Sequence, residues 1–162
     1  AAERSDVFAA IAPVIGGIPD NVAASFAPKS KVSVLIINGL DDPWVLYGGG
    51  KVIPKGRIDR GSIVSTDKAV ALWLEANGIT AAGKSETVPN TDPDDGCQAE
   101  KTTWSDGGND ASVVLYQVDG MGHCYPGGTQ YLPVWLIGAV CKDFDASEVI
   151  ASFFANHAKV GE

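Results

Sequence analysis

Two apolar runs, each followed at once by a polar turn, dominate the hydrophobic pattern of the chain. The first run covers Val32–Ile37 and the second covers Val113–Val118. Both are nearly continuous and rich in β-branched residues, a pattern typical of strands that are buried on both faces in a parallel sheet. The pattern therefore predicts two core strands of an α/β fold.

Two further segments have the periodicity of helices. Apolar positions at helical spacing predict a helix over Ser65–Asn77, with Ser65 as its N-cap and Gly78 just past its end. The same kind of spacing predicts a helix over Asp145–His157, where Asp145 begins a capping box. We expect the first of these helices to connect the two parallel strands.

Shorter segments complete the expected sheet. Phe8–Val14 is a short apolar strand by its composition, and Lys84–Val88 and Gln98–Trp104 have strand character. Ser105–Asp110 is a hairpin-type connection, whereas Val45–Gly61 is broken by glycine and proline and predicts a loop. The expected fold is α/β, with a mostly parallel sheet, an antiparallel ribbon and flanking helices.

The turns after the two core strands carry the candidate chemistry. Asp41 and Asp42 follow the first strand, and Asp42 precedes Pro43, which favours an extended backbone at the aspartate. His123, one of two histidines, follows the second strand on a turn bracketed by glycines. A histidine in such a place also serves simply to close a turn. Acid before histidine is, however, the chain order of these two groups in the α/β-hydrolase triad Ser…Asp…His.

Charge and composition narrow the classes of function. The 162 residues suit one domain, and the net charge of −8 argues against nucleic acid or an anionic membrane as partner. No apolar run reaches the length of roughly 18 residues that a membrane span needs. The first residues are polar, so we expect any export signal to lie upstream of Ala1.

The cysteines leave two interpretations open. Cys97, Cys124 and Cys141 have no metal-site spacing, and we expect neither a metal nor a cofactor. Cys124 and Cys141 flank the loop after His123 and could form a disulfide bond across it. The alternative is that all three are buried free thiols.

Three motifs in order resemble one group of enzymes. LIINGLDDPWVLYGGG resembles the acid turn, VVLYQVDGMGHCYPGG the histidine turn and DFDASEVIASFF the last helix of the polyhydroxybutyrate depolymerase and feruloyl esterase group of α/β-hydrolases. The resemblance implies that Asp42 is the catalytic acid and His123 the base. Asp42 is preferred to Asp41, because the group often has a small residue at the position of Asp41. Asn38 departs from the usual histidine, and Cys124-Tyr125 depart from the usual Thr-Trp.

The resemblance also implies which part of an enzyme this is. The nucleophile of that group lies on G-x-S-x-G, a motif that does not occur here. We therefore expect residues 1–162 to be a partial α/β-hydrolase domain, the C-terminal half that carries acid and histidine. Its expected partners are an ester substrate and either the missing N-terminal half or a second copy, bound through an exposed sheet edge. Enzymes of this group are commonly exported, which favours a secreted or periplasmic protein.

The substrate and the cleft walls are less defined by the sequence. A polyester, a feruloylated or acetylated polysaccharide, or a small ester would each suit such an enzyme. Four aromatic residues near the two turns are candidates to line the substrate cleft, although aromatic side chains more often simply pack: Trp44, Tyr47, Tyr125 and Trp135.

Three other readings remain open. The chain could be a catalytically inactive, hydrolase-derived binding or dimerisation domain. It could also be one of two chains that assemble a hydrolase, or it could belong to a peptidase branch of the prolyl oligopeptidase type, which shares the Asp…His order. A G-x-S-x-G in the coding sequence upstream of Ala1, or a second polypeptide in the purified sample, would separate these readings.

Overall fold

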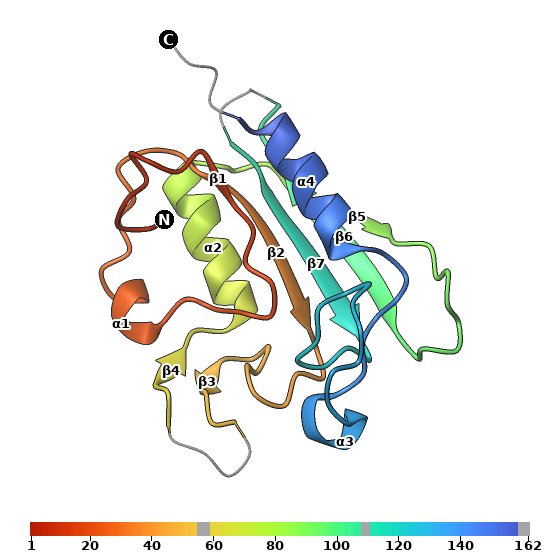
Figure 1. Cartoon of the computed structure of the whole chain (residues 1–162). Helices are drawn as coiled ribbons and strands as arrows, with labels where there is room; N and C mark the ends of the chain where they lie inside the picture. Colours follow the sequence, from red (N-terminus) through yellow and green to blue (C-terminus); the bar gives the residue numbers. More distant parts are fainter. Residues whose placement is uncertain (55–58, 108–110, 159–162) are drawn as a thin grey trace.

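The centre of the fold is a mixed five-stranded sheet (Figure 1). A computed structural model of the chain describes residues 1–54, 59–107 and 111–158. The strands occur in the order β1-β2-β7-β6-β5. The first three strands of this order run parallel, and the last two extend the sheet as an antiparallel ribbon. Their bounds are Ala10–Ile11 (β1), Ser33–Gly39 (β2), Val113–Asp119 (β7), Gln98–Trp104 (β6) and Lys84–Thr87 (β5).

The two predicted core strands lie side by side in the middle of this sheet. Every residue of β2 is buried, as the continuous apolar run predicts. β2 and β7 pair in parallel from Val34 opposite Val113 to Gly39 opposite Val118. Because paired parallel strands end at the same edge of a sheet, the acid turn and the histidine turn emerge next to each other.

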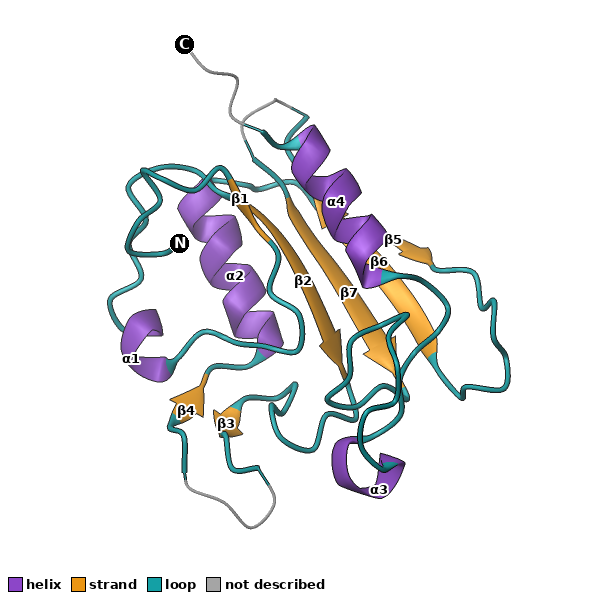
Figure 2. Cartoon of the chain, viewed as in Figure 1, coloured by secondary structure: helices purple, strands orange, loops and turns teal. Residues whose placement is uncertain are grey.

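Two helices cover opposite faces of the sheet, α2 (Thr66–Asn77) and α4 (Ala146–Asn156), as Figure 2 shows. Alternate residues of the central strands face each helix. Val34 and Ile36 pack in one cluster with Trp73 of α2, whereas Leu35 and Ile37 pack in another with Phe153 of α4. The sheet thus separates two apolar layers, which is the arrangement expected of an α/β fold.

The ends of both helices agree with the predicted caps. Ser65 Oγ accepts a hydrogen bond from the amide of Lys68 at 3.1 Å, and Gly78 adopts a left-handed φ of 67°. Asp145 Oδ1 accepts from the amide of Ser147 at 2.6 Å. This capping lowers the pKa of the Asp145 carboxyl, since hydrogen bonds to Ser147 favour the ionised form.

The first predicted strand is shorter in the structure than in the sequence prediction. Only β1, Ala10–Ile11, of the segment predicted as Phe8–Val14 forms a regular strand. Pro13 has no amide proton, and Ile15 takes a positive φ of 47°, so the chain bends away from regular geometry. Pairing continues only as an isolated bridge between Val14 and Ile37.

Small elements occupy the predicted loops. β3 (Gly50–Lys51) pairs with β4 (Ser62–Ile63) within and just beyond the segment predicted as a loop. The remaining helices are single turns, α1 (Asp20–Ala23) and α3 (Val134–Ile137). Part of the Val45–Gly61 loop, residues 55–58, and part of the Ser105–Asp110 connection, residues 108–110, lie outside the described residues. Within the described residues, no helix has the length and apolarity that a bilayer crossing demands.

Candidate active site

Asp42 and His123 meet at the edge where β2 and β7 end. His123 Nδ1 lies 2.8 Å from Asp42 Oδ2, a distance at which Nδ1–H donates to the carboxylate. The carboxyl group is buried, with 3% of Asp42 exposed, whereas 19% of the histidine side chain remains accessible. The parallel register thus brings together two residues that are far apart in sequence.

The acid is oriented by its own turn. Asp42 Oδ1 accepts hydrogen bonds from the amides of Trp44 and Val45, both at 2.8 Å. These bonds close a side-chain turn of the kind that aspartate favours after a strand. With Oδ1 engaged by the backbone, Oδ2 is left to face the imidazole.

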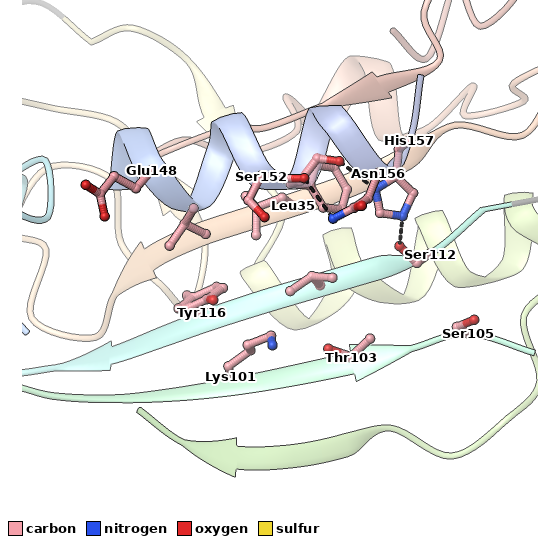
Figure 3. A pocket seen from close by; sticks show the side chains of 13 residues that line it. Leu35, Lys101, Thr103, Ser105, Ser112, Tyr116, Glu148, Ser152, Asn156 and His157 are labelled. Carbon is pink, nitrogen blue, oxygen red and sulfur yellow. Dashed lines mark hydrogen bonds between the residues drawn. The ribbon is translucent and has the colours of Figure 1, made fainter. Parts of the chain in front are cut away.

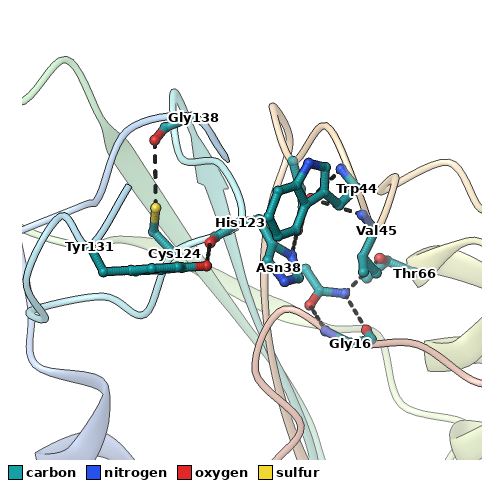
Figure 4. A network of polar contacts seen from close by, with 10 residues as sticks. Gly16, Asn38, Trp44, Val45, Thr66, His123, Cys124, Tyr131 and Gly138 are labelled. Carbon is teal, nitrogen blue, oxygen red and sulfur yellow. Dashed lines mark hydrogen bonds and ion pairs between the residues drawn. The ribbon is translucent and has the colours of Figure 1, made fainter. Parts of the chain in front are cut away.

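The histidine is held from several sides. Its amide donates to the carbonyl of Ile137, and its own carbonyl accepts from Tyr131 Oη at 3.1 Å. The ring of Trp44 lies against the imidazole, with ring centroids 5.0 Å apart, as Figure 4 shows. With Nδ1 committed to Asp42, the Nε2 atom is the one left to exchange protons with another group.

Close backbone contacts explain two glycines of the site. A Cβ on Gly39 would lie 2.1 Å from the carbonyl oxygen of Met121, and one on Gly122 would lie 2.1 Å from that of Ile137. A bridge between Met121 and Ala139 adds the segment after α3 to the same stack. The acid turn, the histidine turn and this segment therefore pack backbone to backbone.

Asn38 has a role that sequence reasoning missed. Its buried amide donates to the carbonyl of Gly16 at 3.0 Å and to Thr66 Oγ1 at 2.9 Å, and its Oδ1 accepts from the Gly16 amide at 3.2 Å (Figure 4). It ties the end of β2 to the loop after β1 and to the start of α2. The available signal was an amide inside an apolar strand, because a buried polar group needs partners.

The four predicted cleft residues are placed differently. Trp44 contacts the ring of His123. Tyr47 is half-buried, with its Oη 2.8 Å from Gln117 Oε1 and 3.1 Å from Asp67 Oδ1. Burial, and next the charge of Asp67, raise the pKa of Tyr47. This phenol is therefore neutral at ordinary pH.

The other two lie on the surface after the histidine turn. Tyr125 is 39% exposed, and its Oη is 3.4 Å from Ser147 Oγ. Trp135, on α3, is 73% exposed. Other exposed aromatic and aliphatic side chains lie on α3 or just before it in the sequence: Tyr131, Leu132 and Val134.

The second histidine lies elsewhere, in a cavity of about 590 Å³ between α4 and the sheet (Figure 3). His157 Nε2 is 2.8 Å from Ser112 Oγ, and Nδ1 is 2.7 Å from the carbonyl of Phe153. The Nε2 contact links the end of α4 to the residue before β7, and the Nδ1 contact closes the last turn of α4. Neither Asp42 nor His123 lines this cavity.

All three cysteines are free and buried. One group of three possible metal ligands stands out in the described part of the chain, Asp95, Cys97 and Cys141, whose ligand atoms lie within 4.8 Å of one another. One interpretation of the sequence was a disulfide bond between Cys124 and Cys141. The structure instead places Cys141 beside Cys97, and Cys124 packs in a separate cluster.

No family model matches the chain. The chain is 29% identical over 159 residues to the protein named "Putative esterase NocK" from Nocardia uniformis subsp. tsuyamanensis. The match covers 94% of this chain and 45% of that protein. The chain thus spans less than half the length of the relative that it matches.

Proposed function

We propose that this chain supplies the acid and the base of a carboxylic ester hydrolase that uses a Ser-His-Asp triad. The carrying observation is the 2.8 Å contact between His123 Nδ1 and the buried Asp42 carboxylate. The likeness to a protein named as an esterase supports the same class of reaction. The fold proposed for the intact enzyme is that of an α/β-hydrolase.

Each of the two residues has a defined task in this mechanism. A serine hydroxyl attacks the ester carbonyl carbon, and His123 Nε2 takes the hydroxyl proton. His123 then returns this proton to the leaving alcohol. Asp42 accepts the Nδ1–H bond, keeps the imidazole in the reactive tautomer and stabilises the imidazolium that forms. A water molecule then attacks the carbonyl carbon of the acyl-enzyme while His123 takes its proton. His123 returns this proton to the serine oxygen, and the acid product leaves.

The nucleophile and the oxyanion hole come, in this proposal, from a polypeptide segment that packs against β1. The chain has no G-x-S-x-G, and among the described residues β1 is an edge strand that pairs with β2. A cavity of about 190 Å³ lies beside β1, and the residues that line it include Ile11, Asn38 and, from α2, Trp73. The missing N-terminal half of the hydrolase suits this edge, and a second copy of the chain is the alternative occupant.

The substrate that we propose is an ester of a polymer, either a polyester or a feruloylated or acetylated polysaccharide. Exposed Tyr125 and Trp135 near the histidine turn would offer apolar and aromatic contact area to such a substrate. Trp44 would border the reacting centre through its contact with His123. An exported location, secreted or periplasmic, fits a polymer substrate too large to enter a cell.

The test is hydrolysis of a short-chain nitrophenyl ester by the complete gene product that carries residues 1–162. We expect His123→Ala to lower kcat by about 10³-fold or more, because the serine loses its base. His157→Gln is the matched control and should retain most of the activity, since His157 bonds only Ser112 and Phe153 among the described groups. Equal activity of His123→Ala and the unmodified protein would refute the proposed triad.

The rival function is an inactive binding or dimerisation domain, favoured by the absence of G-x-S-x-G. A fluorophosphonate probe, which reacts with activated serines, separates the two. Covalent labelling of the complete gene product that disappears in His123→Ala supports the hydrolase. An unlabelled, dimeric protein supports the binding domain.

A further inference from the structure

Two buried thiols face each other behind the histidine turn. Cys97 directly precedes β6, and Cys141 lies in the segment that follows α3. Their Sγ atoms lie within 4.8 Å, and the two residues are 3% and 0% exposed. Rotation of the two side chains and small shifts of the backbone could bring sulfur atoms at this distance close enough to form a disulfide bond.

Their environment holds the two segments together already. Asp95 Oδ1 accepts from the amide of Cys97 at 2.7 Å, and Asp95 Oδ2 accepts from the amide of Lys142 at 2.6 Å. Thr91 adds a bond from its amide to Asp143 Oδ1 at 2.9 Å. Residues near Cys97 in the sequence are therefore hydrogen-bonded to residues near Cys141.

A bound metal fits this group less well than a covalent bond. Both carboxylate oxygens of Asp95 are occupied by backbone amides. Burial raises the pKa of Cys97, and it raises the pKa of Cys141 to about 11, so both thiols hold their protons at neutral pH. A metal would have to displace both thiol protons and share the Asp95 carboxylate with these two amides, whereas a disulfide leaves the bonds of the carboxylate unchanged.

We propose that Cys97 and Cys141 form a disulfide bond when the protein folds in an oxidising environment. The oxidant is a disulfide such as oxidised glutathione. One cysteine thiolate attacks it and releases one glutathione thiol, and the second cysteine then attacks the mixed disulfide and releases the other. The two cysteine protons leave with these products, and two electrons pass to the oxidant. Because both residues are buried in the folded chain, the bond forms before this part of the core closes.

The bond would brace the turn that carries His123. On one side, a Cβ on Gly120 would lie 2.3 Å from the carbonyl oxygen of Gly96, so the turn rests directly on the Cys97 segment. On the other side, the amide of Gly127 donates to the carbonyl of Cys141 at 2.8 Å. A bond between the two cysteines joins the backbone on both sides of the turn.

Cys124 provides the matched control. It directly follows His123, but its Sγ contacts the carbonyl of Gly138 at 3.5 Å and Gln130 Nε2 at 3.8 Å, away from the pair. It packs with Ile137 and Val140 in its own cluster. Its removal should leave the proposed bond intact.

The experiment maps disulfides in the polypeptide that carries residues 1–162, after refolding with reduced and oxidised glutathione. Free thiols are blocked with N-ethylmaleimide in denaturant at acidic pH, and the unreduced protein is digested and analysed by mass spectrometry. We expect a linked peptide pair that contains Cys97 and Cys141, in the unmodified protein and in Cys124→Ala alike. Reduction should lower the Tm by about 5–10 °C, because the cross-link closes a long loop.

Three results would overturn the proposal. One is modification of both Cys97 and Cys141 by N-ethylmaleimide after oxidative refolding. Another is a bond from Cys141 to Cys124 instead. The third is stoichiometric zinc, measured by elemental analysis, that is lost in Cys97→Ala while the thiols remain unlinked. None of these measurements depends on ester hydrolysis, so the proposed function stands or falls separately.

Discussion

Two adjacent aspartates, Asp41 and Asp42, have different hydrogen-bond partners. Asp42 is buried, and its Oδ2 accepts a hydrogen bond from His123 Nδ1. Asp41 is exposed, and its Oδ2 accepts a hydrogen bond from the amide of Gly120 at 3.0 Å. Asp41 therefore helps to attach the acid turn to the histidine turn. In the proposed triad, Asp42 is therefore the carboxylate that sets the tautomer of the imidazole.

This difference gives a paired test in the complete gene product. Asp42→Asn should lower kcat by about 10³–10⁴-fold, because an amide at this position favours the wrong imidazole tautomer. Asp41→Asn should lower it by less than about tenfold, since the amide oxygen still accepts from Gly120. Steady-state hydrolysis of a nitrophenyl ester measures both. A large loss in Asp41→Asn with little change in Asp42→Asn would reverse the assignment.

The glycine that follows Asn38 allows the two turns to touch. Gly39→Ala should lower the free energy of unfolding by about 2–4 kcal/mol, because the new Cβ meets the carbonyl of Met121 and the backbone must move. Gly48→Ala is the control, since its Cβ has no neighbour within 4 Å among the described atoms. We expect that control to change stability by less than about 1 kcal/mol. Urea unfolding measures the free energy of unfolding of both variants. Equal values would contradict the predicted clash between the new Cβ and the carbonyl of Met121.

At the scale of elements, two buried amides clamp the two ends of β2. Asn77, at the end of α2, accepts from the Val32 amide at 3.0 Å and donates to the Val32 carbonyl at 2.8 Å. At the other end, Asn38 belongs to β2 itself, and its side chain bonds the backbone of Gly16 and the hydroxyl of Thr66. The strand that delivers Asp42 is thus fixed at both ends by side-chain hydrogen bonds.

Removing either clamp should destabilise the protein. Asn38→Ala and Asn77→Ala should each lower the free energy of unfolding by about 2–3 kcal/mol. Asn77→Ala leaves the buried backbone groups of Val32 without these partners, and Asn38→Ala does so for the partly buried backbone groups of Gly16 and the buried Thr66 hydroxyl. Asn21→Ala, on the exposed surface of α1, should change it by less than about 0.5 kcal/mol. Thermal or urea unfolding of the three variants is the measurement. If all three lose the same small amount, the amides do not act as clamps.

The sequence predicted those parts of the fold that local patterns encode. Continuous apolar runs located β2 and β7, and capping residues located α2 and α4, because burial and end chemistry are written in neighbouring positions. The short β1, the partners of Asn38 and the neighbour of Cys141 depend on contacts between distant segments. A pattern along the chain shows which groups need partners, but not which segment supplies them.

At the scale of the whole molecule, the two edges of the sheet differ in chemistry. The β5 edge carries exposed, charged Lys84 and Glu86, which discourage pairing with another strand. The β1 edge, Ala10–Ile11, carries apolar side chains and no charge. Exposed Val7 and Phe8 lie just before it. An uncharged edge of this kind is suited to a further strand, in keeping with the proposal that the nucleophile segment packs there.

Amide hydrogen exchange can test which partner covers this edge. In the complete gene product, amides of residues 8–14 should exchange slowly, because an added strand pairs with them. In residues 1–162 expressed alone, the same amides should exchange faster at low concentration and slow down as copies pair at high concentration. Amides of β5, Lys84–Thr87, are the internal control and should exchange alike in both proteins. If residues 8–14 also exchange alike in both at every concentration, neither an added strand nor a second copy binds at β1. The serine would then have to approach His123 Nε2 without extending this sheet.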